Sequence, residues 1–234
     1  MSAIKELAFA KAIGGGGGGS STGFDVEVDM GENTTTAGFN ATVTTVAGHN
    51  AVSYNSNSII NYCKKVKASG IETIASSAFP MCSKLESVDF PDAKYIQSYA
   101  FSGRSSLKEI NFPSLISVGD GAFSGCTGIT DVYLPECTTI SSSSAFGNCT
   151  GIKRIVLPKV ETLGHFGGCS GVEYIYIGPN CTSISSGAFS GVPITCKVEC
   201  GFAEGAISGF PANGGWNGNP ADLNITYNVP APTE

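Results

Sequence analysis

Cysteine and histidine are the residue types in this chain that could bind a metal ion, form disulfides or act as nucleophiles. The 234 residues include nine cysteines and only two histidines, His49 and His165. No C-x-x-C pair occurs, so the spacing typical of a zinc site is missing. No G-x-S-x-G, H-E-x-x-H or Walker sequence occurs either, and His165 is expected to be an ordinary loop residue. The sequence therefore predicts no catalytic residue, no metal site and no cofactor, and a protein that is not an enzyme.

Composition excludes two classes of partner. The net charge is −6, and only 14% of the residues are charged. Phosphate backbones are bound by clustered Lys and Arg, so nucleic acid is not an expected partner. No run of about 18 apolar residues occurs, so no membrane insertion is predicted. Lys5, Glu6 and Lys11 interrupt the apolar residues at the N-terminus, and no secretory signal peptide is expected there.

An internal repeat organises the middle of the chain. Six phenylalanines recur at intervals of 20 to 23 residues, at Phe79, Phe101, Phe123, Phe146, Phe166 and Phe189. In most units a cysteine follows three residues later, then an apolar triplet in the pattern L-x-x-V-x-L, then a proline. The unit SLKEINFP is an example, in which Ile110 and Phe112 alternate with polar residues as in a short strand.

One such unit is too small to bury its own apolar side, so units must stack and share a continuous core. The predicted fold is a leucine-rich-repeat solenoid with a parallel β-sheet of short strands and irregular loop and turn connections. A short N-terminal helix and β-rich caps complete it. Neighbouring strands in such a sheet lie about 4.8 Å apart.

The repeated pattern I-xxx(x)-AF-xx-C-xx-L-xx-V-x-LP resembles the leucine-rich repeats of the BspA-like bacterial surface-protein family, over residues 63 to 200. The resemblance implies a non-enzymatic cell-surface or secreted protein that adheres or binds. The segment LGHFGGC departs from the pattern, because its loop is shortened and His165 replaces the usual alanine. The arrangement of both termini is also similar, more loosely, to repeat proteins associated with prophage tails.

The repeat gives positions to the cysteines. Cys82, Cys126, Cys149 and Cys169 share one inward column, Cys137 and Cys181 share another, and Cys63 and Cys200 fall on core positions of strands. Buried free thiols are the favoured interpretation. A disulfide between successive units is sterically possible, because the spacing of stacked strands lies within the usual Cα separation of a disulfide. Cys196 is expected to point outward, while Thr195 takes the core position.

The outward positions of the strands form two columns along the predicted sheet. On three successive units these columns place Tyr133, Arg154, Val156, Tyr174 and Tyr176 together. Tyr and Arg are over-represented at binding hot spots, so these five residues are the candidate ligand-binding patch for a protein or a glycan. The alternative is that tyrosines simply favour strands and the patch has no partner.

Four segments are predicted. Residues 1–20 form a helix and a polyglycine linker, 21–58 a β-rich cap or assembly segment, 59–200 the repeats, and 201–234 a C-terminal cap containing Trp216. Strands within 23–54 are expected to cover the open edge of the first repeat. The helix over 2–13 is too short to be stable alone. It is expected either to form a homo-oligomer, such as a trimer, or to dock into a larger assembly; a disordered tail is the alternative.

The predicted function is a non-enzymatic binding or adhesion module that presents a sheet face to a protein or glycan on a cell surface. Two alternatives stay open: a receptor-binding protein of a phage tail or virion, and a structural protein of an oligomeric assembly. The expected location is extracellular, on a bacterial surface or a virion, by an export route that the sequence does not identify.

Overall fold

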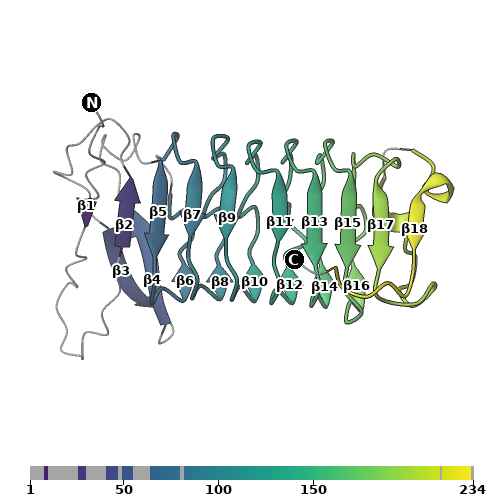
Figure 1. The fold of residues 1–234 in the computed structure, drawn as a ribbon, viewed down its shortest axis with the longest axis horizontal. Coiled ribbons are helices and arrows are strands. Elements are labelled where there is room, and N and C mark those ends of the chain that lie inside the picture. Colours follow the sequence, from purple (N-terminus) through teal and green to yellow (C-terminus); the bar gives the residue numbers. More distant parts are fainter. Residues whose placement is uncertain are drawn as a thin grey trace.

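The structure of the chain, a computed structural model, describes four N-terminal strand segments, 8–9, 26–29, 41–46 and 49–54, together with residues 64–79, 82–216 and 218–232. It is a stack of similar coils that runs from β5 at the left to β17 at the right, with one row of strands on each of two faces (Figure 1). The predicted solenoid of parallel short strands is confirmed.

One face, the long-strand face, carries strands of three or four residues. These are β5 (Lys65–Ala68), β7 (Ser87–Asp89), β9 (Glu109–Asn111), β11 (Asp131–Tyr133), β13 (Arg154–Leu157), β15 (Tyr174–Ile177) and β17 (Lys197–Cys200). The other, the short-strand face, carries two-residue strands. These are β6 (Thr73–Ile74), β8 (Tyr95–Ile96), β10 (Ser117–Val118), β12 (Thr139–Ile140), β14 (Thr162–Leu163) and β16 (Ser183–Ile184).

The core between the two faces is organised by the repeated phenylalanines. The rings of Phe79, Phe101, Phe123, Phe146, Phe166 and Phe189 are fully buried and stack in one line. Four of the five centroid separations lie between 4.7 and 5.1 Å, which matches the strand spacing. The repeat period therefore places one aromatic ring at the same position in each coil, so that the rings of successive coils stack.

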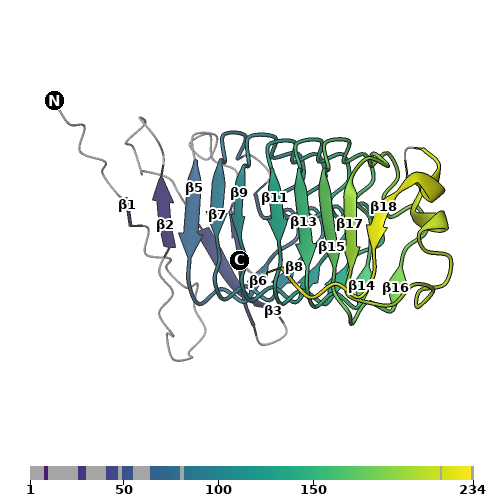
Figure 2. The ribbon, with the colours of Figure 1, turned by 45° about the vertical axis from the view of Figure 1, so that its right-hand side comes forward.

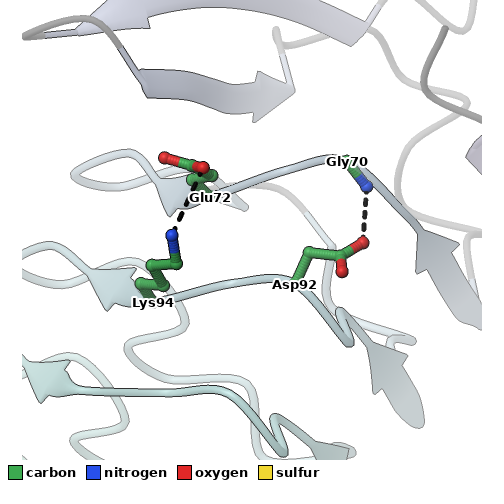
Figure 3. A network of polar contacts seen from close by, with 4 residues as sticks. All are labelled: Gly70, Glu72, Asp92 and Lys94. Carbon is green, nitrogen blue, oxygen red and sulfur yellow. Dashed lines mark hydrogen bonds and ion pairs between the residues drawn. The ribbon is translucent and has the colours of Figure 1, made fainter. Parts of the chain in front are cut away.

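Polar side chains also link successive coils. Between β6 and β8 the carboxylate of Asp92 accepts a hydrogen bond from the backbone N–H of Gly70, at 2.7 Å. Lys94 Nζ lies 3.4 Å from Glu72 Oε1 in the same pair of coils (Figure 3). Such exposed ion pairs add little stability each, so the stacked core carries the fold.

The N-terminal strands cover the open edge of the first coil. Strand β2 (Val26–Asp29) pairs antiparallel with β5, and β4 (His49–Tyr54) pairs parallel with β6 and antiparallel with β3 (Ala41–Val46). The β-rich cap expected at this end takes this form (Figure 1). The boundaries of the four predicted segments stay predictions.

The helix predicted over residues 2–13 is wrong where the structure describes that segment. Ala8 and Phe9 form strand β1, which pairs antiparallel with β2. A strand partner in another part of the chain satisfies backbone groups that an isolated helix of this length holds only weakly. The other residues of the predicted helix, and the polyglycine run, lie outside the described residues.

The C-terminal cap closes the other end. Trp216 stacks on Phe189 with a centroid separation of 4.5 Å, and its indole N–H donates to the carbonyl of Pro211 at 3.0 Å. Two 3-10 turns, η2 (Ala212–Gly214) and η3 (Pro220–Asp222), precede β18 (Asn224–Thr226), which adds parallel to β17. Trp216 thus covers the last phenylalanine as the sequence predicted.

The long-strand face is interrupted once. Its strands fall into two sheets, β1-β2-β5-β7-β9 and β11-β13-β15-β17-β18, whereas the short strands β6 to β16 form one unbroken ladder. Across the interruption, β10 pairs with β12, and Phe123 stacks on Phe146 at 4.9 Å. The two halves of the solenoid are therefore joined at this point by the short-strand ladder, the turns and the phenylalanine stack.

The cysteines fill core positions. Eight of them are free and buried in the described residues, and Cys63 lies outside that part of the chain. The thiols of Cys126, Cys149 and Cys169 lie 3.0 to 3.1 Å from the carbonyl oxygens of Phe101, Phe123 and Phe146, so the predicted column is regular. Burial raises the pKa of Cys82 and Cys137 to about 12, which keeps these thiols neutral.

The predicted outward position of Cys196 is wrong. Cys196 is 1% exposed and Thr195 is exposed, the reverse of the expectation. The backbone N–H of Cys196 donates to the carbonyl of Pro193, so a tight turn shifts the register of this last coil by one residue. The shift places a small apolar thiol inside and leaves the threonine hydroxyl in water, which avoids burying a polar group.

Candidate binding face

The candidate ligand-binding patch lies on β11, β13 and β15 of the long-strand face. Parallel pairing aligns Asp131 with Arg154 and Tyr174 in one column. The same register aligns Tyr133 with Val156 and Tyr176 in the second column. The structure therefore brings together the five residues that the sequence predicted, Tyr133, Arg154, Val156, Tyr174 and Tyr176, on three successive strands.

The first column is tied together by charge. Arg154 Nη1 lies 3.3 and 3.2 Å from the two carboxylate oxygens of Asp131. Arg154 is still about one third exposed, so the guanidinium is held in position without being withdrawn from solvent. An arginine that is fixed by one carboxylate loses less conformational entropy when it binds a second group.

Tyr174 belongs to a second polar group at the end of the patch. Its hydroxyl donates to Glu199 Oε2 at 2.6 Å, and Lys197 Nζ lies 2.5 Å from Glu199 Oε1. The Lys197 ammonium also lies 5.8 Å from the centroid of the Tyr174 ring. Burial, together with the hydrogen bond to Glu199, raises the pKa of Tyr174. The lysine and the tyrosine lower the pKa of Glu199, so this group is an ionised carboxylate with two partners at neutral pH.

The second column is not open to solvent throughout. Val156 and Tyr176 are both 0% exposed, which corrects the expectation that they form part of an exposed patch. They face away from the solenoid core, and the segment that follows β18 covers them. Tyr176 donates its hydroxyl to the carbonyl of Val229 at 3.2 Å. Tyr133, Arg154 and Tyr174 are half-buried at the sides of this covered strip.

The covering segment is residues 227–232, which we call the C-terminal strap. Its course begins with two backbone hydrogen bonds, from Asn228 to the carbonyl of Phe202 and from Val229 to that of Cys200. From there the chain turns back along the solenoid across β17, β15 and β13, and ends in front of the long-strand face (Figures 1 and 2). The strap bends at Asn228, whose φ is 58°, and contains Pro230 and Pro232.

Sequence reasoning missed the strap and Glu199 as partners of the patch. The sequence does contain a signal for Glu199. This residue follows Tyr133, Val156 and Tyr176 in the second outward column, and it stands two residues after Lys197 in the chain. The contact between Tyr176 and Val229 joins residues 53 positions apart and belongs to no repeat. No local pattern could have indicated it.

The described residues show no alternative chemical centre. Among them, no three His, Cys, Asp or Glu side chains lie together so that they could hold a metal ion. No helix in that part of the chain has the length and apolarity needed to cross a membrane. His165 lies in the shortened loop, where a ring nitrogen is 3.0 Å from the carbonyl oxygen of Ser186.

Comparison with known proteins identifies the repeats. The model of the BspA-type leucine-rich repeat region matches six copies over residues 72–195, just over half of the chain. This chain belongs to the BspA-type leucine-rich repeat family. Proteins with such repeats are often surface-associated, and the family and fold are typically those of non-enzymatic binding modules.

Two solved structures are similar to this BspA-type chain. The T. pallidum leucine-rich repeat protein is 24% identical, with a TM-score of 0.52 over 68% of this chain and 89% of that protein. A leucine-rich repeat protein from Bacteroides ovatus is 18% identical, with a TM-score of 0.41 over 72% of this chain and 55% of that protein. No curated protein matches the sequence. The likeness to the T. pallidum protein supports the fold.

Proposed function

We propose that this BspA-type repeat protein is a non-enzymatic surface module that binds an extended segment of a partner protein on the long-strand face. The observation that carries the proposal is the C-terminal strap, because it runs back across this same face and accepts a hydrogen bond from Tyr176 (Figure 2). A face that accepts six residues of its own chain has the shape and the hydrogen-bonding groups for an extended peptide.

The partner would bind beside the strap, where Tyr133 and Arg154 remain accessible. Tyrosine gives a large contact area at a low cost in conformational entropy, and arginine recognises carboxylates with two parallel hydrogen bonds. Asp131 holds Arg154 in place but leaves part of the guanidinium in solvent. An extended partner segment with an acidic side chain therefore fits this part of the face best.

Cell binding tests the proposal. Fluorescently labelled full-length protein is added to bacterial and epithelial cells, and bound protein is measured by flow cytometry before and after the cells are treated with protease. We expect binding that protease treatment removes and that Tyr133→Ser combined with Arg154→Ala lowers at least tenfold. Thr139→Ala, an exposed change on the opposite face, is the matched control and leaves binding unchanged.

Two results contradict the proposal. Binding that survives protease treatment of the cells and that the double variant still lowers would indicate that the partner of the long-strand face is not a protein. Equal binding by the double variant and the Thr139→Ala control would indicate that the long-strand face is not the binding surface. Circular dichroism of each variant establishes that the loss does not come from unfolding, since both changed side chains lie outside the core.

A further inference from the structure

In five of the six coils that carry a repeated phenylalanine, one turn requires a left-handed backbone conformation. The residue two positions before the repeated phenylalanine has a positive φ in five coils: Ser77 at 52°, Tyr99 at 59°, Gly121 at 57°, Ser144 at 53° and Gly187 at 73°. Glycine adopts this conformation without strain, and small polar residues tolerate it better than bulky ones do. Four coils use glycine or serine, whereas one uses tyrosine, which is among the residues least suited to the position.

Tyr99 is also the most exposed large hydrophobic side chain among the described residues, at 56%. Its ring lies over the next coil, because a Cβ built on Gly121 would fall 2.5 Å from Cε1 of Tyr99. Gly121 thus leaves room for the ring to pack flat against the turn, and the other side of the ring faces solvent. A hydrogen bond from the backbone N–H of Tyr99 to the carbonyl of Asp120, at 2.8 Å, fixes the turn beneath it.

A second exposed tyrosine lies close by in the sequence. Tyr95, on β8 of the short-strand face, is 37% exposed, and no other large hydrophobic side chain of the described residues is as exposed as these two. Four residues of extended chain span at most about 14 Å between Cα atoms, a distance on the scale of a short oligosaccharide. Residues held in strained backbone conformations cluster at active sites and ligand clamps.

Polar side chains lie in the turn between the two tyrosines, in the next coil, and in register with Tyr95. Gln97 lies between them in the sequence, and its amide oxygen accepts hydrogen bonds from the backbone and hydroxyl of Ser76. Asp120 accepts from the hydroxyl of Ser141 at the same turn. Along the short-strand face, the register places Thr73 and Ser117 on either side of Tyr95.

This chemistry selects the class of ligand. An aromatic ring packs well against the C–H face of a pyranose ring, and amide, carboxylate and hydroxyl groups around it can bind sugar hydroxyls. Lys94 is next to Tyr95 in the sequence, and its charge is already paired with that of Glu72 (Figure 3). The exposed carboxylate of Asp120 and the net charge of −6 disfavour an anionic polymer.

We propose that Tyr99 and Tyr95 form a binding site for an uncharged polysaccharide at the turn that leaves β8. The site lies on the short-strand face and is separate from Tyr133 and Arg154. A protein interface would need large apolar anchors with further apolar area around them, whereas Thr73 and Ser117 stand in register with Tyr95 and no other large hydrophobic side chain of the described residues is as exposed as the two tyrosines. The strained turn serves to hold the Tyr99 ring in a fixed orientation before the sugar binds.

Affinity electrophoresis of the full-length protein tests the site. Native gels contain one of four neutral polymers, namely mannan, laminarin, hydroxyethylcellulose and dextran, or the anionic polymer polygalacturonic acid. We expect at least one neutral polymer to retard the protein and polygalacturonic acid not to do so. Tyr99→Ser, which installs the residue that two other coils use, reduces the affinity at least tenfold. Tyr99→Phe keeps the affinity within about twofold, because the ring is retained.

Controls separate this site from the long-strand face and from folding. Tyr133→Ser leaves the retardation unchanged, so the polysaccharide site can fail or succeed independently of the proposed function. Tyr99→Ser is expected to keep or raise the Tm, since serine fits the left-handed turn better than tyrosine. Retardation by none of the four neutral polymers, or equal retardation of the Tyr99→Ser variant, would overturn the proposal. A fall in Tm of more than about 4 °C in that variant would also overturn it, because the ring would then be a structural part of the turn.

Discussion

Replacing Phe123 by alanine is expected to uncouple the two halves of the solenoid. Phe123 is fully buried and lies 5.1 Å from Phe101 and 4.9 Å from Phe146 between ring centroids. It also contacts Phe112 edge-on at 6.1 Å. Its coil stands at the interruption between β9 and β11, where no long-strand pairing joins the halves. The stack of Phe123 on Phe146 therefore crosses this junction together with the β10–β12 pairing and the backbone hydrogen bonds of the turns.

The magnitude follows from the burial and the position. Replacing a buried phenylalanine by alanine costs about 3 to 5 kcal/mol. In a repeat protein this loss falls on the interface between neighbouring coils rather than on the whole chain. With a loss of about 4 kcal/mol and a urea m-value of about 2 kcal/mol/M, we expect the two halves to unfold with midpoints about 2 M apart. The unaltered protein should unfold in one transition.

The single tryptophan makes the assay possible. Trp216 is the only tryptophan and stacks on Phe189, so its fluorescence reports the C-terminal half, whereas far-UV circular dichroism reports all coils. In urea the two signals should coincide for the unaltered protein and separate for Phe123→Ala. Phe166→Ala is the matched control, because Phe166 is equally buried and stacks on Phe146 at 4.8 Å within unbroken ladders on both faces.

The control decides the interpretation. Phe166→Ala is expected to lose comparable stability while its two signals stay together. Coincident transitions in both variants would refute the idea that the interruption at β9 is a weak junction. A loss of less than about 2 kcal/mol in Phe123→Ala would show that neighbouring coils close the cavity, and the phenylalanine stack would then not carry the junction.

Much of the fold was predictable because each coil repeats the same pattern of inward apolar and outward polar residues. The position of Phe123 predicts those of Phe101 and Phe146, since rings at the same height in adjacent coils must stack. Inward and outward positions on the long strands follow from alternation. The short-strand ladder is harder to predict, because strands of two residues are too short to show alternation. The first apolar position of the repeated pattern falls on Val118 and Ile140, but the pattern does not indicate their pairing.

The candidate site was predictable only in part, and the reason is the same. The strand register brings Tyr133, Arg154 and Tyr174 together, and this register follows from aligning the repeated units in the sequence. The burial of Val156 and Tyr176 depends on the C-terminal strap, which lies outside the repeat and contacts Tyr176 through a single hydrogen bond from a distant part of the chain. The prediction for Cys196 was wrong for a related reason, because the last coil turns at Pro193 and no longer follows the repeat.

Two further perturbations test the strap and the buried thiols. Tyr176→Phe removes the hydroxyl that donates to the carbonyl of Val229. The variant should lose about 1 kcal/mol of the free energy of unfolding, with a Tm lower by about 2 to 4 °C and faster amide exchange at Val229. An unchanged exchange rate would mean that other contacts hold the strap. Alkaline pH should destabilise the protein. Burial raises the pKa of Cys82, Cys137 and Cys200 from the ordinary 9.0 to about 12, so the stability that these neutral thiols contribute is complete below pH 9 and is lost as the pH rises toward 12. Each such thiol that ionises only on unfolding lowers the free energy of unfolding by about 1.4 kcal/mol per pH unit in that window. Cys137→Val, which installs the residue found at the equivalent position 160, should therefore reduce the dependence of urea stability on pH between pH 9 and 10.5 by about that amount. An identical pH dependence in the variant would mean that this thiol is not shielded from water in the way that its burial implies.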